Sequence, residues 1–167
     1  NGQGHETVFA QFLSDQTGIP TDHIRVVQGD SDLIANGGGT GGSRSGTVQA
    51  NATLQTVAVM EKAFRAFLSD KLAVDADQIV FDDERFRAPG SNLSPTFLEV
   101  ANMARAAGRD DLMQHSAYAV LDSRSFPNGA HICEVEIDPD TGAVEVARYS
   151  VVDDFGNLLN PMLVEGQ

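Results

Sequence analysis

The sequence predicts an α+β fold in two layers, with helices packed on a mixed β-sheet and an antiparallel hairpin at the C-terminal end. The longest helical pattern covers residues 46–72, where apolar residues recur on one face. The last third changes character, because residues 130–137 and 143–152 are strong strand patterns. Residues 138–142, D-P-D-T-G, lie between them and have the composition of a hairpin turn.

The N-terminal third predicts one helix and one strand. Apolar residues between Val8 and Leu13 recur at helical spacing, and Gly18 supplies a C-terminal stop. Residues 24–28 are rich in β-branched side chains and predict a strand. Residues 29–35 form a polar connection to a glycine-rich stretch.

The middle of the chain predicts short elements. Residues 79–81 predict a strand, and the three acids at 82–84 then alternate between faces, which favours a solvated turn over a metal site. Residues 86–92 form a second strand or a loop. Residues 94–95, S-P, predict the start of a short helix with serine as its cap, and Gly108 ends it. An internal boundary between lobes is expected near residues 85–95.

Residues 115–121 alternate and predict a further strand. Cys133, the single cysteine, lies in a predicted strand, and we expect it to be a core residue. One cysteine cannot form an internal disulfide and is too few for a thiolate zinc or iron–sulfur site, so we expect a reducing, cytoplasmic compartment. A helix start at Asn160-Pro161 comes just before the last residue, and we expect the chain to be a piece of a longer polypeptide.

The charge balance excludes some partners. The 167 residues include 11 basic and 24 acidic side chains, for a formal net charge of −13, with no basic run. This argues against free nucleic acid or an anionic membrane as partner. No apolar stretch approaches the roughly 20 residues that span a bilayer. A small phosphorylated ligand remains compatible with the negative net charge, because a few N–H donors close to the ligand can outweigh the diffuse electrostatic field of the whole chain.

Residues 36–45 read N-G-G-G-T-G-G-S-R-S and lead directly into the long helix. Glycine permits positive φ and close approach, and at a helix N terminus the backbone N–H groups and the helix dipole favour an anion. Arg44 adds a forked, charge-assisted donor. The stretch therefore predicts a cradle for an anion, most often a phosphate, and the alternative is a flexible surface loop.

A second glycine-flanked cluster, residues 2–7 with the sequence G-Q-G-H-E-T, opens the first predicted helix. The side chain of Gln3 carries both donor and acceptor groups. The alternative is a helix cap in which Gln3 is merely exposed. The histidines are scattered, and no nucleophile–base pair is visible.

Gly37, Gly39 and Gly42 satisfy the pattern G-x-G-x-x-G of dinucleotide-binding folds. That fold needs a strand running straight into the loop, and the nearest predicted strand ends several residues earlier. The nucleotide-triphosphate loop also fails, because Ser43-Arg44 stands where Lys-Ser/Thr is required. A nucleotide-binding enzyme is therefore a weak alternative that would require a strand ending at Asn36.

Four motifs in this order resemble one protein family. They are residues 2–7, residues 37–45, residues 128–142 (N-G-A-H-I-C-E-V-E-I-D-P-D-T-G) and residues 151–167 (V-V-D-D-F-G-N-L-L-N-P-M-L-V-E-G-Q). The chain resembles the molybdenum-cofactor-binding large subunit of the xanthine dehydrogenase, aldehyde oxidase and carbon monoxide dehydrogenase family. The resemblance covers nearly the whole chain, although Phe155 stands where many members have cysteine.

The resemblance implies a set of cofactor contacts and no direct metal ligand. Gln3 would place its amide near the apical ligand of the molybdenum, and Gly4 and His5 would line the pterin. The pyranopterin phosphate or the nucleotide part would be held by Gly42, Ser43, Arg44 and Ser45. Gln167 would approach the cofactor from another side.

The resemblance also implies molybdopterin with molybdenum, either as the plain pterin or in the cytosine dinucleotide form that bacterial relatives favour, with FAD and [2Fe-2S] clusters on other domains or subunits. The intact enzyme would hydroxylate an aldehyde, a purine or another N-heterocycle with water-derived oxygen. Its partners would be the remaining large subunit, the iron–sulfur and flavin subunits, and a small organic substrate. The family's glutamate base in a later G-x-G-E segment is absent, so we expect the fragment alone to be inactive.

One alternative belongs to another class of protein. It is a non-catalytic assembly or binding module that keeps the fold and holds no cofactor. The two readings differ in whether the glycine clusters at residues 2–7 and 36–45 lie together, because only a shared site requires it.

Overall fold

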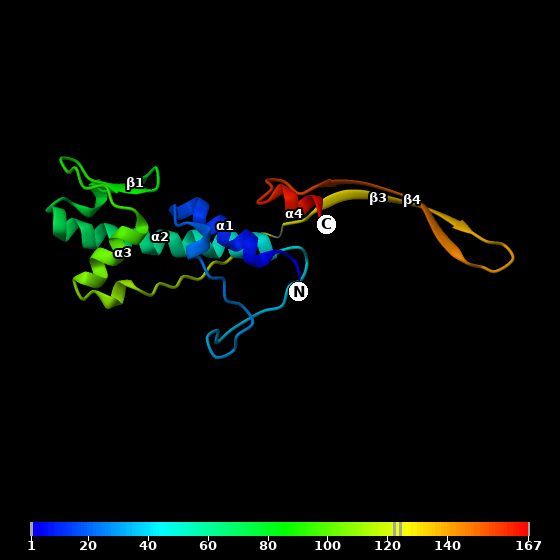
Figure 1. Cartoon of the computed structure of the whole chain (residues 1–167), viewed down its shortest axis with the longest axis horizontal. Helices are drawn as coiled ribbons and strands as arrows, with labels where there is room; N and C mark the ends of the chain where they lie inside the picture. The colour runs from blue at the N-terminus through cyan, green and yellow to red at the C-terminus, as the bar shows by residue number, and fades with distance from the viewer. Residues whose placement is uncertain (1, 122, 124, 167) are drawn as a thin grey trace. The chain divides into compact units, whose positions relative to one another are not determined.

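The computed structural model describes residues 2–121, 123 and 125–166. The chain divides into two compact units, residues 1–123 and residues 124–167, and each is described by itself. Figure 1 shows the order of the elements along the chain. The segment 85–95, where an internal boundary was expected, lies within the first unit.

The first unit is mainly helical. Its α-helices are α1 (His5–Thr17), α2 (Ser45–Leu72) and α3 (Phe97–Ala106), and its 3₁₀ turns are η1 (Thr21–His23), η2 (Ala76–Gln78) and η3 (Asp110–Leu112). A short antiparallel pair, β1 (Val80–Asp82) and β2 (Arg85–Arg87), completes it. The long predicted helix is confirmed, and it begins at the last residue of the glycine-rich stretch.

The core of the first unit is aromatic. Phe64 on α2, Phe86 on β2 and Phe97 at the start of α3 are almost fully buried and contact one another. Leu68 and Val100 fill the space beside them and have no exposed surface. Such burial stabilises the fold by about 1.5–3 kcal/mol for each large apolar side chain.

Local chemistry fixes the ends of the shorter elements. The cap of α3 is Thr96 and not the predicted Ser94, because the Thr96 hydroxyl accepts from the Glu99 N–H while the Glu99 carboxylate accepts from the Thr96 N–H. Of the three acids, Asp82 ends β1 and residues 83–84 form the turn, and Arg87 pairs with Asp82 and Asp83 at 3.0 and 3.1 Å. This segment is therefore structural.

The second unit is a long hairpin and one short helix. Strands β3 (Asn128–Ile137) and β4 (Val144–Asp154) pair antiparallel, with a register shift between Glu134 and Val135. Helix α4 (Pro161–Glu165) follows, capped by the Asn160 side chain, which accepts from the Leu163 N–H. The predicted hairpin and the predicted helix start are confirmed.

The α+β class is confirmed, but several finer predictions need correction. Within the described residues both sheets are two-stranded and antiparallel, so the expected mixed sheet is not formed. Residues 24–28 and 115–121 are not strands. Their β-branched or alternating composition is not matched by a partner strand, and strand formation depends on that context.

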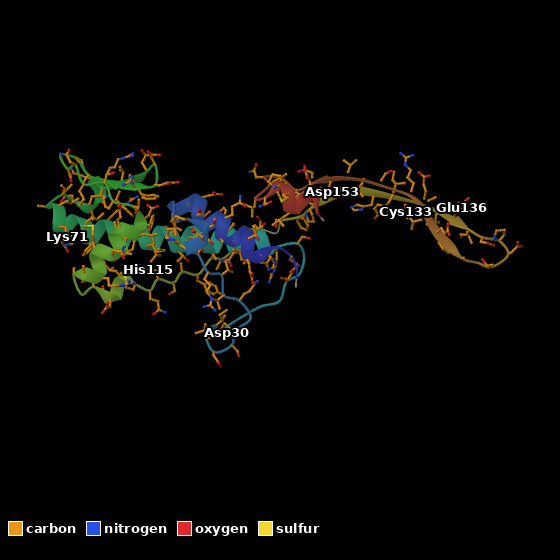
Figure 2. The ribbon with its side chains drawn as sticks, viewed as in Figure 1. Asp30, Lys71, His115, Cys133, Glu136 and Asp153 are labelled. Atoms are coloured by element: carbon orange, nitrogen blue, oxygen red, sulfur yellow. The ribbon has the colours of Figure 1, made fainter. Side chains whose placement is uncertain are left out.

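Cys133 lies in a strand, as predicted, but it is exposed and not a core residue. Figure 2 labels it on the hairpin, between Asp153 and Glu136. Among the described residues of this second unit, none covers the side of the strand on which Cys133 lies. Among the helices that the structure describes, none combines the length and apolar character needed to cross a membrane.

Candidate functional site

The first glycine cluster shapes the start of α1. Gly2 and Gly4 both have left-handed backbone conformations, with φ of 72° and 71°, which side-chain-bearing residues adopt only with strain. Gly4 is the N-cap residue and makes no side-chain capping bond. The exposed Gln3 lies between them, and the His5 ring stacks on Phe9 with centroids 4.9 Å apart. The start of α1 therefore presents backbone N–H groups and one amide side chain.

The second cluster shapes the start of α2 in a similar way. Gly42 and Ser43 have φ of 62° and 51°, and Arg44 then returns to φ −103° as the N-cap. Such a change of handedness between neighbouring residues turns successive N–H groups toward one side, as in anion-binding nests. Ser43 is one of few residues with a side chain in this conformation, and its strain suits a functional loop.

One contact in this loop involves a residue that sequence reasoning missed. The hydroxyl oxygens of Thr40 and Ser45 lie 3.1 Å apart, within hydrogen-bonding distance. The contact joins the middle of the loop to the first residue of α2. Thr40 is the one residue with a side chain among five glycines. This position in the sequence could have identified Thr40 as a candidate functional residue.

The first turn of α2 lacks the usual compensation for a helix N terminus. It has no acidic residue, and Arg44 makes no side-chain capping bond. Helix α3, in contrast, satisfies its first turn with Thr96 and Glu99. The N terminus of α2 is therefore suited to an external anion, because its dipole and N–H donors are not matched by a side-chain cap.

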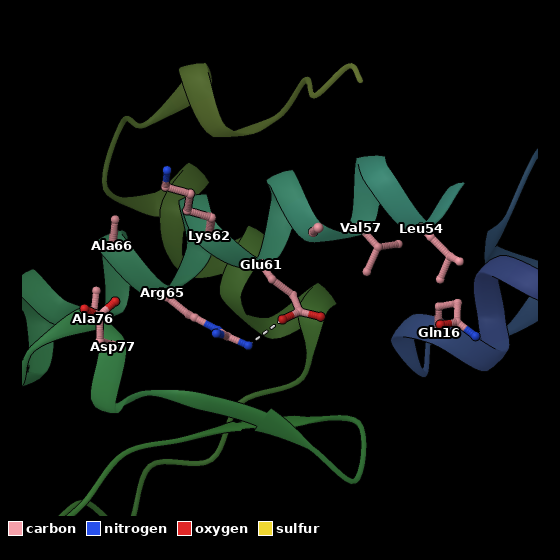
Figure 3. Close-up of a pocket in the computed structure, with 10 residues that line it drawn as sticks. Gln16, Leu54, Val57, Glu61, Lys62, Arg65, Ala66, Ala76 and Asp77 are labelled. Atoms are coloured by element: carbon pink, nitrogen blue, oxygen red, sulfur yellow. Dashed lines mark hydrogen bonds and ion pairs between the residues drawn. The ribbon is translucent and has the colours of Figure 1, made fainter. Parts of the chain in front are cut away.

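The two helix starts lie at the same end of one helix pair. Helices α1 and α2 pack against each other, and Figure 1 shows both running in the same direction. Gln16 of α1 and Leu54 of α2 line the same groove, and Figure 3 shows both side chains at one end of it, so these two residues lie near the same level of the helix pair. About eleven residues earlier, roughly 16 Å along each helix axis, are His5 and the start of α2. The structure thus brings the two glycine clusters to one end of the pair.

Most glycines of the two clusters are not required by packing within the chain. A Cβ added at Gly2, Gly37 or Gly42 would meet no atom within 4 Å, and the same holds for Gly38, Gly39 and Gly41. Residues 36–44 of the loop are all exposed. The glycines therefore leave open space in which another molecule can approach the backbone closely.

One groove of the first unit lies away from the two glycine clusters. It encloses about 530 Å³ beside the middle of α2 and contains none of the predicted site residues. Figure 3 shows Arg65 paired with Glu61 inside it. The Nε atom of Arg65 is buried and has no hydrogen-bond partner among the described residues. This groove is shallow and mixed in charge, and we assign it no role in cofactor binding.

The described residues offer hydrogen-bond donors and not metal ligands. No group of three or more histidine, cysteine, aspartate or glutamate residues in residues 2–121, 123 and 125–166 is placed to hold a metal ion. Chemically, the N–H donors at the two helix starts suit an anionic ligand such as a phosphate. Gln167, the remaining predicted contact, lies outside the described residues.

The nucleotide-binding alternative has no structural support. It required a strand ending at Asn36, and the structure describes residues 24–44 without any strand. The match to G-x-G-x-x-G is therefore accidental.

Comparisons with known proteins point to one family. A family model described as a molybdopterin cofactor-binding domain matches residues 1–167. The carbon monoxide dehydrogenase large chain of Afipia carboxidovorans is 32% identical over 99% of this chain and 21% of its own length. The xanthine dehydrogenase molybdenum-binding subunit of Escherichia coli O157:H7 is 26% identical over 99% of this chain and 23% of its own.

A solved structure agrees with these relatives. The crystal structure of a Cu,Mo carbon monoxide dehydrogenase in its carbon-monoxide-reduced state has a TM-score of 0.77 and 32% sequence identity. The match covers 99% of this chain and 21% of that one, so the chain spans about a fifth of its relatives' length. The resemblance inferred from the four motifs is confirmed: this chain belongs to the molybdopterin cofactor-binding domain family of the molybdenum-containing oxidoreductases.

Proposed function

We propose that this chain holds the pterin cofactor of a molybdenum hydroxylase between the N termini of α1 and α2. The observation that carries the proposal is the position of both glycine-opened helix starts at one end of the same helix pair. Neither start has a side-chain cap. Two helix dipoles and two sets of N–H donors would then act on one anionic ligand.

Each predicted contact has a distinct task in this proposal. Gly42, Ser43 and Ser45 bind phosphate oxygens through N–H and hydroxyl donors, and Arg44 neutralises the phosphate charge. Gln3 donates and accepts hydrogen bonds beside the metal, and Gly4 and His5 line the pterin. When bound, the molybdenum centre supplies the oxidation of a C–H carbon with oxygen derived from water. Gln167 contributes a further polar contact.

The cofactor form and the partners are parts of the same proposal. We assign the cytosine dinucleotide form, since the open glycine loop of residues 36–45 leaves room for an extended phosphate-linked group. FAD and [2Fe-2S] clusters would reside on other domains or subunits. The substrate would be an aldehyde or an N-heterocycle, and residues 1–167 alone would be inactive because they contain no G-x-G-E segment.

The test is the cofactor content of the full-length large subunit. Arg44→Ala removes a charge-assisted contact worth about 1.5–3 kcal/mol, so molybdenum and pterin retention should fall roughly 10- to 100-fold. Arg105→Ala removes an exposed arginine at the end of α3 and serves as the matched control. Equal retention in both variants would contradict the assignment of Arg44. A wild-type protein without molybdenum would favour the non-catalytic assembly module instead.

A further inference from the structure

The β3–β4 hairpin has two chemically different faces. Residues that pair across an antiparallel ladder share a face, and the two faces alternate along each strand. The pairs Val135–Val146 and Ile137–Val144 therefore lie on one face, and Cys133–Tyr149 extends it toward the base of the hairpin. We call this the apolar face, made of Val135, Ile137, Val144, Val146, Tyr149 and Val151.

The opposite face is charged over its outer half. Glu134 pairs with Arg148, and Glu136 pairs with Glu145. Like charges that face each other across a ladder are destabilising unless water screens them. Figure 2 labels Glu136 and Cys133, which are three residues apart in one strand and so belong to opposite faces. The charged face is built for solvent, although Ile132 and Val152 lie on it near the base.

The apolar face is not covered by any of residues 125–166. Its side chains are between 46% (Val151) and 63% (Val146) exposed. A two-stranded hairpin is only marginally stable in water by itself, and contiguous exposed apolar patches mark interaction sites. Aliphatic and charged residues alternate at positions 134–137 and 144–146, in the outer half of the hairpin, and such alternation specifies one covered face.

The base of the apolar face is closed by a polar cluster. His131 lies between Tyr149 and Asp153, with Nδ1 at 3.1 Å from the Tyr149 hydroxyl and Nε2 at 3.2 Å from the Asp153 carboxylate. The Tyr149 hydroxyl is therefore engaged, and its ring stays on the apolar face. From this cluster to the turn, the face carries no charged side chain among the described residues. Its occupant must accordingly be apolar.

We propose that the apolar face is a packing surface for an aliphatic layer contributed by the rest of the same large-subunit polypeptide. The matched relatives are about five times longer than this chain, which covers 21% of them. They therefore hold ample chain to cover the face, whereas a strand of Val and Ile offers a small molecule no polar anchor. The hairpin thus packs inside the large subunit, and its apolar face contains none of the residues assigned to the cofactor.

Cys133 is a built-in reporter for this proposal. In the assembled full-length protein, its reaction with a maleimide should be on the order of 100-fold slower than in urea, because labelling would require local opening. The matched control is Glu134→Cys in a Cys133→Ser background, one position along the strand on the charged face. That thiol should react about as fast as in urea, within roughly tenfold.

The labelling experiment has three outcomes that test whether the apolar face alone is covered. Slow labelling at Cys133 with fast labelling in the Glu134→Cys control supports the proposal. Fast labelling at Cys133 would overturn it. Slow labelling at both positions would overturn the assignment of a single covered face.

Photo-crosslinking identifies the occupant. A benzophenone amino acid replaces Tyr149, aromatic for aromatic, in the assembled enzyme. The proposal expects a crosslink within one polypeptide, to a peptide outside residues 1–167, with no gain in subunit mass on a denaturing gel. A product with the mass of two large subunits, or of a large subunit joined to another subunit, would overturn the choice of occupant.

Discussion

The hydroxyl groups of Thr40 and Ser45 lie 3.1 Å apart and join the glycine loop to the first residue of α2. If this contact orders the loop for the cofactor, Thr40→Ala should weaken cofactor retention about fivefold, since a hydrogen bond contributes about 1 kcal/mol net. Thr40→Ser should retain the contact and the cofactor. Equilibrium molybdenum and pterin content of the full-length protein measures both variants.

A double-mutant cycle isolates the shared interaction. Ser45→Ala should lose at least as much cofactor as Thr40→Ala, because the Ser45 hydroxyl is also assigned a phosphate contact, and the double variant should lose little more than Ser45→Ala alone. Full additivity of the two losses would mean that the hydroxyl contact is not what the residues share.

Gly42 and Gly37 provide a matched pair within the same loop. Neither added Cβ would meet an atom within 4 Å, but only Gly42 has a positive φ, of 62°. Gly42→Ala should therefore strain the backbone by about 1–2 kcal/mol and lower cofactor affinity roughly 5- to 30-fold. Gly37→Ala should have little effect on the same cofactor titration. Equal losses in the two variants would show that space, and not backbone conformation, is the requirement at Gly42.

Much of the fold could be predicted because it depends on local patterns. The long helix, the C-terminal hairpin and its turn follow from periodicity and turn composition. The failures at residues 24–28 and 115–121 have a common cause, which is that a strand needs a partner that a local pattern cannot supply. The cap of α3 is Thr96 and not the predicted Ser94, because the reciprocal hydrogen bonds between Thr96 and Glu99 determine where the helix begins.

The site could be predicted only in pieces. Each glycine cluster could be predicted to form a loop of N–H donors before a helix, because the glycines and the helical pattern that follows them are local features of the sequence. Their common location was not visible, since it depends on the packing of α1 against α2. Thr40 was missed for a similar reason, as its contact with Ser45 exists only once the loop is folded. The exposure of Cys133 likewise could not follow from its strand alternation.

Gly18 follows the last residue of α1 and lies close to Glu84 in the β1–β2 turn. Its φ is 69°, and an added Cβ would lie 2.6 Å from the Glu84 Cβ. Gly108 also has a positive φ, of 72°, but has open space around it. Gly108→Ala should cost about 1–2 kcal/mol from strain alone, and Gly18→Ala about 1–3 kcal/mol more from the clash. Urea unfolding of the two variants gives the difference.

The clash also has a specific rescue. Glu84 has a φ of 59°, so Glu84→Gly removes the obstructing side chain and suits its backbone. The free energy of unfolding lost in Gly18→Ala should be largely regained in the Gly18→Ala, Glu84→Gly double variant. A double variant as unstable as Gly18→Ala would rule out the contact with Glu84 as the cause.

Asp138 makes the hairpin turn sensitive to pH. Its carboxylate accepts from the N–H groups of Thr141 and Asp140, at 3.0 and 2.8 Å, and these bonds lower its pKa. A lowered pKa stabilises the turn above the unfolded value of about 3.9, and this stability is lost as the pH falls through the folded pKa. A carboxyl-detected NMR titration should place the Asp138 midpoint below that of a model peptide.

The matching variant is Asp138→Asn, which keeps an acceptor oxygen and removes the charge. The Thr141 and Asp140 amide shifts should lose their acid transition in this variant. If the wild-type amide shifts show no transition that disappears with Asp138→Asn, the carboxylate does not hold the turn.

The central claim is that one cofactor contacts the starts of α1 and α2 together. Amide hydrogen exchange of the full-length subunit, with and without cofactor, measures it most directly. The N–H groups of residues 5–7 and 45–47 should both exchange more slowly when the cofactor is bound, because both sets would donate to it. Residues 97–99 of α3 are the internal control, since Thr96 and Glu99 already satisfy that helix start. Protection at only one of the two glycine-opened starts, or at neither, would contradict the shared site.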